Sequence, residues 1–130
     1  MSNVSLAKLL RDFSQHRCVF ENRPTKYKFG TLNYGEIPGT LNSADGDPWD
    51  VFAPGYSYSL RTGKEYKPIG ILGIFYLSNG NHKIAVRLSI PGFDKIKAMN
   101  EIKRYCKRYS EYTKICGVFV PHHKQRNRLM

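Results

Sequence analysis

The feature that most constrains the fold is the way glycine, proline and asparagine divide residues 17–120 into short segments. The clearest strand patterns cover residues 26–32, 67–77, 82–90 and 115–120. An Asn-Gly pair at Asn79-Gly80 predicts a hairpin turn between two of them. Because no regular alternation of strands and helices occurs, the sequence predicts a mainly β (α+β) fold, built as a small, closed, partly Greek-key barrel.

Two amphipathic helices flank this region. The first is predicted over residues 3–15, with Ser2 or Asn3 as its cap, because apolar residues recur three and four positions apart at Leu6, Leu9, Leu10 and Phe13. The second is predicted to begin at Asp94 and to end near residue 112, with an apolar face formed by Ile96, Met99, Ile102, Cys106 and Tyr109.

The net charge of the chain indicates which classes of partner it can bind. The chain of 130 residues carries 21 Lys and Arg against 10 Asp and Glu, a formal net charge of +11. Such an excess favours nucleic acid, an anionic membrane surface or phosphate-rich small molecules as partners, although the same charges are also compatible with an ordinary solvated surface. We expect a single domain over residues 1–120 and a basic tail over 121–130. A homo-oligomer is compatible with the sequence.

Cellular location follows from what the chain lacks. No apolar stretch approaches the roughly 20 residues needed to cross a bilayer, and the N-terminus does not read as a secretory signal. The three cysteines are odd in number and form no Cys-x-x-Cys pair, which argues against a disulfide framework. We therefore expect an intracellular, cytoplasmic protein, with a nuclear or virion-associated location left open.

Three of the ten acidic residues lie close together in residues 45–50, which we call the acidic loop. Asp45 and Asp47 are two positions apart in a segment stiffened by glycine and proline, and Asp50 enters the next predicted strand. Three carboxylates that converge in this way suit a hard divalent cation such as Mg²⁺. The alternative is a structural turn in which an aspartate accepts hydrogen bonds from backbone N–H groups.

Three blocks in order resemble the soluble (family I) inorganic pyrophosphatases. They are NYGEIPGTL at residues 33–41, DGDPWDV at 45–51 and PIGIL at 68–72. The family carries N-Y-G-x-I-P-x-T-L, D-G-D-P-x-D-V and R-P-I-G-V-L at similar spacing, and the resemblance covers about residues 26–90. It implies a five-stranded, OB-like barrel with flanking helices and Mg²⁺-dependent hydrolysis of diphosphate.

The resemblance also implies roles for individual residues. Asp45, Asp47 and Asp50 match ligands of Mg²⁺ or Mn²⁺, and Asp47 additionally matches the general base. Tyr34 matches a tyrosine of the catalytic site that contacts phosphate. Further phosphate contacts are implied for Lys26, Lys83 and Tyr109.

The chain departs from the family pattern at several of these places. The turn at residues 77–82 carries no acid where the family has a second pair of aspartates, and Lys28 stands in place of a glutamate. The segment at 30–32 is too short to hold the family's phosphate-binding arginine, and Lys67 replaces another arginine. Trp49 replaces a smaller residue in the signature, which we expect to reshape the floor of the cleft.

Two functions remain open at this point. The first is a diphosphatase of low activity that binds Mg²⁺ and diphosphate, since each lost electrostatic contact costs about 3 kcal/mol of transition-state stabilisation. The second is a protein with the same fold but without the chemistry, which binds nucleic acid or an acidic partner through its basic surface. A shortened relative of this kind also suits a viral origin.

Overall fold

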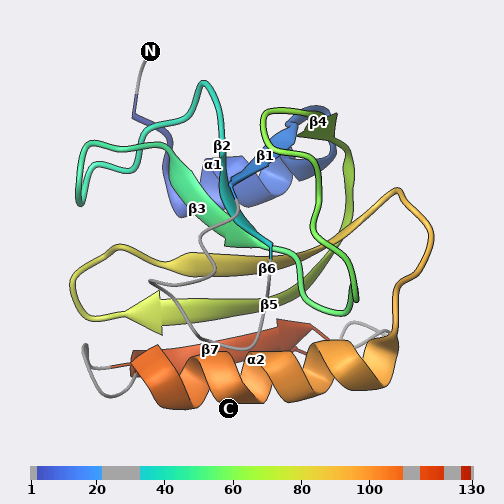
Figure 1. Cartoon of the computed structure of the whole chain (residues 1–130). Coiled ribbons are helices and arrows are strands. Elements are labelled where there is room, and N and C mark those ends of the chain that lie inside the picture. The colour runs from blue at the N-terminus through green and yellow to red at the C-terminus, as the bar shows by residue number, and fades with distance from the viewer. Residues whose placement is uncertain (1–2, 22–32, 110–114, 122–126, 130) are drawn as a thin grey trace.

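The computed structural model describes residues 3–21, 33–109, 115–121 and 127–129, with the elements shown in Figure 1. The predicted strand at 26–32 lies outside them. The described ranges contain two α-helices and one 3₁₀ helix: α1 (Leu6–Arg11), η1 (Phe13–Gln15) and α2 (Lys95–Tyr109). The described strands are β1 (Cys18–Glu21), β2 (Tyr34–Ile37), β3 (Trp49–Phe52), β4 (Glu65–Tyr66), β5 (Pro68–Leu77), β6 (Lys83–Leu88), β7 (Ile115–Pro121) and β8 (Asn127–Leu129).

The described strands form one sheet in the order β4-β1-β2-β3-β6-β5-β7-β8. β3 and β6 run parallel, and the other neighbours are antiparallel. The mainly β class with flanking helices is therefore confirmed. Within the described residues the sheet is open rather than a closed barrel, because β4 and β8 lie at opposite ends of this order. β8 also shows that part of the predicted tail is a strand paired with β7.

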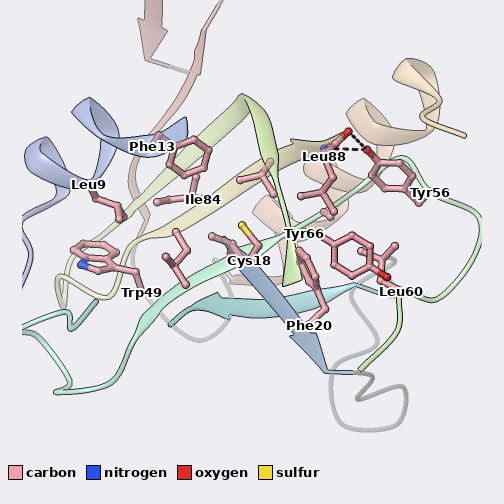
Figure 2. Close-up of a cluster of buried hydrophobic side chains, with 14 residues drawn as sticks. Leu9, Phe13, Cys18, Phe20, Trp49, Tyr56, Leu60, Tyr66, Ile84 and Leu88 are labelled. Atoms are coloured by element: carbon pink, nitrogen blue, oxygen red, sulfur yellow. Dashed lines mark hydrogen bonds between the residues drawn. The ribbon is translucent and has the colours of Figure 1, made fainter. Parts of the chain in front are cut away.

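One face of the central strands forms the larger hydrophobic core. Figure 2 shows Leu9 and Phe13 of the N-terminal helices lying over strand residues that include Cys18, Trp49 and Ile84. Ser5 caps α1 by accepting a hydrogen bond from the Lys8 N–H at 3.2 Å. Helix α1 is shorter than predicted, and a 3₁₀ turn continues it, but the apolar positions that defined the prediction do contact the core.

The opposite face of the sheet packs against α2, which runs along the lower edge of Figure 1. A second cluster joins strand residues to the helix: Phe52, Phe75, Leu77, Ala85, Ile102 and Tyr105. Tyr105 stacks on Phe52 with ring centroids 4.1 Å apart. Tyr34, a residue of the candidate site, packs against this cluster.

The buried side of α2 differs in part from the predicted apolar face. Asp94 caps the helix as predicted, with its Oδ1 accepting the Lys97 N–H at 3.1 Å. Ile96 is wrong as a core residue, since it is 76% exposed, and Ala98 and Glu101 are buried instead. Cys106 and Tyr109 have side chains outside the described part of the structure.

Glu101 fastens α2 to the loop that follows β3. Its side chain is only 1% exposed and accepts the Gly55 N–H at 2.6 Å. Burial raises the pKa of the Glu101 carboxyl, while the Gly55 hydrogen bond and the nearby Lys97 and Arg104 act in the opposite direction. The buried carboxylate therefore has a structural role. The apolar pattern of the sequence could not predict its burial, because glutamate is not an apolar residue.

Candidate active site

A row of three charged residues crosses the sheet on the α2 side. Glu36 of β2 lies directly opposite Asp50 of β3, and Asp50 lies opposite Lys83 of the parallel strand β6. Two carboxylates facing each other across neighbouring strands normally destabilise a sheet. Here the ammonium group of Lys83 forms an ion pair with Asp50, which offsets one of the two charges.

Lys83 is deeply buried for a lysine. The residue is 5% exposed, and its Nζ lies 6.0 Å from the centre of the Tyr34 ring. Tyr34 in turn stacks on Tyr105 of α2, with centroids 6.4 Å apart and planes 8° from parallel. Since a buried charge requires a partner, Asp50 and the aromatic ring together keep the ammonium group in place beside the pocket.

A pocket of about 310 Å³ opens beside this row. It is lined by Glu21, Tyr34, Gly35, Glu36, Asp47, Pro48 and Asp50. Four of these residues carry carboxylates, in a protein with a strong positive net charge. An anion such as diphosphate can enter this pocket only together with additional cations, because the carboxylates repel it.

The three aspartates of the acidic loop have different surroundings. Asp47 and Asp50 line the pocket, whereas Asp45 is not among its lining residues. The Asp45 Oδ1 accepts the Asp47 N–H at 3.0 Å, the arrangement of an Asx turn. The pocket thus brings two of the three predicted metal ligands together, and Asp45 holds the backbone of the loop.

Trp49 does not reshape the cleft floor as expected. Because side chains alternate along a strand, Trp49 and Asp50 face opposite sides of β3, and Trp49 is 3% exposed in the larger core. Its indole N–H donates to the Val4 carbonyl at 2.7 Å. The larger side chain therefore anchors the N-terminal segment, on the side of the sheet away from the pocket.

The structure adds two acidic residues that the sequence interpretation missed. Glu21 is the last residue of β1, and Glu36 lies in the middle of β2. Each is an isolated carboxylate in the sequence, so only the pairing of β1, β2 and β3 brings them beside Asp50. Two predicted phosphate contacts are not placed, since Lys26 and the side chain of Tyr109 lie outside the described residues.

The described carboxylates around the pocket do not form a site for a resident metal ion. Carboxylates are the ligands that Mg²⁺ prefers. In the part of the chain that the structure describes, however, no three His, Cys, Asp or Glu side chains form a group that could hold a single ion. Lys83 also occupies one of the available carboxylates. The described residues therefore do not fit a preformed metal cage.

Comparisons with known proteins agree with this fold. The family model for inorganic pyrophosphatase matches residues 2–120. The chain belongs to the inorganic pyrophosphatase family. A search of curated protein sequences finds no match.

The crystal structure of the inorganic pyrophosphatase from Ehrlichia chaffeensis resembles the chain with a TM-score of 0.54 and 20% sequence identity. The match covers 73% of this chain and 64% of that one. The chain thus matches less than two thirds of the length of that pyrophosphatase, and at this identity the likeness concerns the fold alone. Among the described residues, no helix is long and apolar enough to cross a membrane.

Proposed function

We propose that this chain binds diphosphate as its Mg²⁺ complex and hydrolyses it slowly to two phosphates. The observation that carries the proposal is the pocket in which four carboxylates adjoin a buried lysine ammonium group. Mg²⁺ typically keeps several waters and binds through one or two carboxylates together with substrate phosphates. The pocket therefore suits an ion that arrives with diphosphate as part of the substrate, even though the described residues form no preformed metal cage.

The residues divide the work as follows. Lys83 and Tyr34 contact a phosphate group, with Lys26 and Tyr109 as further contacts implied by the family pattern. Asp47 and Asp50 face the cations that accompany the substrate, and Asp45, the third ligand implied by the family pattern, holds the backbone of the acidic loop. Asp47 also accepts a proton from the water that attacks one phosphorus, and the bond from that phosphorus to the bridging oxygen breaks.

A low rate follows from the missing charges. The turn between β5 and β6 carries no carboxylate, and the Lys83 ammonium neutralises part of Asp50. Each electrostatic contact that is lost costs on the order of 3 kcal/mol, or about a hundredfold in rate. We expect hydrolysis that is measurable over the uncatalysed reaction and far slower than in members of the family with the full set.

The test is phosphate release from diphosphate by the purified chain with millimolar Mg²⁺. We expect release that depends on protein concentration and stops when a chelator removes the metal, because the carboxylates then repel the bare anion. A diphosphate-induced rise in thermal midpoint should show the same metal dependence. Failure to release phosphate would exclude the diphosphatase function, and a missing shift in midpoint would also exclude binding.

A second candidate function, binding of nucleic acid, is favoured by the outer surface of α2. Among the side chains of this helix that the structure describes, four cations are exposed: Lys95, Lys103, Arg104 and Lys107. Its single acidic residue, Glu101, is buried against Gly55. The exposed side of the helix therefore offers positive charge with no acid of its own, which suits a phosphate backbone.

Charge reversal tests the α2 surface. The double variant Lys95→Glu/Lys103→Glu should weaken binding of single-stranded DNA and reduce the slope of log K against log salt by about 2, one for each lost phosphate contact. The control, Lys64→Glu/Lys67→Glu beside β4, makes the same change in net charge at exposed positions elsewhere. Equal effects of the two variants would show that net charge, and not this surface, governs binding.

A further inference from the structure

Asn42 is a buried polar side chain next to the acidic loop, and both ends of its amide are hydrogen-bonded. It is 4% exposed and lies five residues before Asp47, outside every block of the family resemblance that carries a functional residue. Its backbone N–H donates to the Asp47 carbonyl at 2.8 Å, and its carbonyl accepts the Gly46 N–H at 2.8 Å. Residues 42–47, which we call the Asn42 turn, are thereby closed into a compact unit.

The Asn42 side chain joins this turn to a distant part of the chain. Its Oδ1 accepts the Ala44 N–H at 2.9 Å, and its Nδ2 donates to the Gly80 carbonyl at 3.1 Å. Gly80 lies in the turn between β5 and β6, three residues before Lys83, the first residue of β6. A single buried amide therefore connects the segment that carries Asp47 with the segment that carries Lys83.

The two turns also pack closely against each other. Gly80 adopts a φ of +82°, and a Cβ added there would lie 3.1 Å from the Cβ of Ala44. The hairpin turn has internal bonds of its own, since the Gly80 N–H donates to the Leu77 carbonyl at 3.0 Å and the Leu77 N–H to His82 Nδ1 at 2.9 Å. Both partners of the Asn42–Gly80 bond lie in turns closed by hydrogen bonds of their own, so the bond connects the position of one turn to that of the other.

We propose that Asn42 is a positioning residue that fixes the acidic loop relative to the β5–β6 turn and thereby sets the place of Asp47 relative to Lys83. Its role in turnover rests on the proposed function, because Asp47 and Lys83 are the groups that face water and phosphate there. Reacting groups must be held closely, and a displacement of about 1 Å can cost a hundredfold in rate. Asn42 itself does not line the pocket and acts only through the backbone.

Two variants disturb the contact between Asn42 and Gly80, one from each side. Asn42→Ala removes both side-chain hydrogen bonds, while Gly80→Ala leaves Asn42 intact and forces the turns apart at a positive φ. The matched control is Asn79→Ala. It removes a local hydrogen bond in the same hairpin turn, which the Asn81 N–H donates to Asn79 Oδ1 at 2.9 Å, and it leaves the acidic loop unchanged.

All variants are compared at a temperature at which each is fully folded. In Asn42→Ala and Gly80→Ala we expect amide hydrogen exchange at Ala44 and Gly46 to rise about tenfold or more, and kcat for diphosphate to fall about tenfold with a smaller change in KM. Asn79→Ala should match the wild type in both measurements. If Asn42 only stabilised the fold, its substitution would lower the thermal midpoint without changing kcat more than KM.

The outcomes separate this inference from the proposed function. Unchanged exchange at Ala44 and Gly46 in Asn42→Ala, or equal effects in all three variants, would overturn the positioning role. A wild type that releases no phosphate would overturn the diphosphatase function instead. In that case two measurements still test the positioning role of Asn42: amide hydrogen exchange at Ala44 and Gly46, and whether Asn42→Ala weakens the diphosphate-induced rise in thermal midpoint.

Discussion

Asp47→Asn is expected to lower phosphate release by about a hundredfold or more, while Asp45→Asn should leave it close to the wild-type rate. The two residues are two positions apart and carry the same group, but only Asp47 lines the pocket. Removal of its charge takes away both a proton acceptor and an electrostatic contact, each important in the transition state. Asn at position 45 still offers a side-chain oxygen to the Asp47 N–H, and asparagine and aspartate are about equally good at such caps.

Phosphate release by both variants and the wild type, measured at equal concentration with millimolar Mg²⁺, checks this expectation. Thermal midpoints serve as the folding control, because both substitutions keep the shape of the side chain. Equal and large losses in both variants would assign Asp45 to the metal-binding set as the family pattern implies. Equal rates in all three proteins would remove Asp47 from the catalytic site.

Local sequence patterns predicted much of the fold. The Asn-Gly pair correctly placed the turn between β5 and β6, and the strands on both sides of it lie within a few residues of the expected bounds. These elements are set by short-range chemistry, namely turn residues and strand propensity. The closure of the sheet depends on which distant strands pair, and the parallel contact of β3 with β6 is not visible in any local pattern.

The family followed from three blocks in order, and the match over residues 2–120 confirms it. The composition of the pocket was harder to predict. Glu21 and Glu36 reach it only through pairing of β1, β2 and β3, and the Lys83–Asp50 ion pair joins residues 33 positions apart. Sequence spacing gives Asp45 and Asp47 the same role, whereas in the structure Asp47 lines the pocket and the Asp45 side chain accepts the Asp47 N–H. The register of neighbouring strands, rather than the spacing of residues within a motif, decides which charged side chains lie close together.

Gly35 belongs to the block at residues 33–41 that resembles the pyrophosphatase family, and the close approach of β1 also requires a glycine at this position. It lies between Tyr34 and Glu36 in β2 and is paired with Phe20 of β1. A Cβ added to Gly35 would lie 2.0 Å from the Val19 carbonyl oxygen and 2.7 Å from the Phe20 Cα. Both are backbone atoms, so no rotation of a side chain relieves the overlap, and the pairing of β1 with β2 depends on the absence of a side chain.

Gly35→Ala is therefore expected to reduce the free energy of unfolding by about 4 kcal/mol or more, at the upper end of single substitutions, or to prevent folding. Gly70→Ala in β5 is the matched control, because the nearest atom to its added Cβ, the Cβ of Arg87, is 4.0 Å away. There the smaller entropy of the unfolded alanine chain should leave stability unchanged or raise it by up to about 1 kcal/mol. Urea unfolding of both variants, followed by circular dichroism, measures the difference. Similar stability of the two variants would mean that β1 does not approach Gly35 as closely as described, and the positions of Glu21 and Glu36 in the pocket would then have to be revised with it.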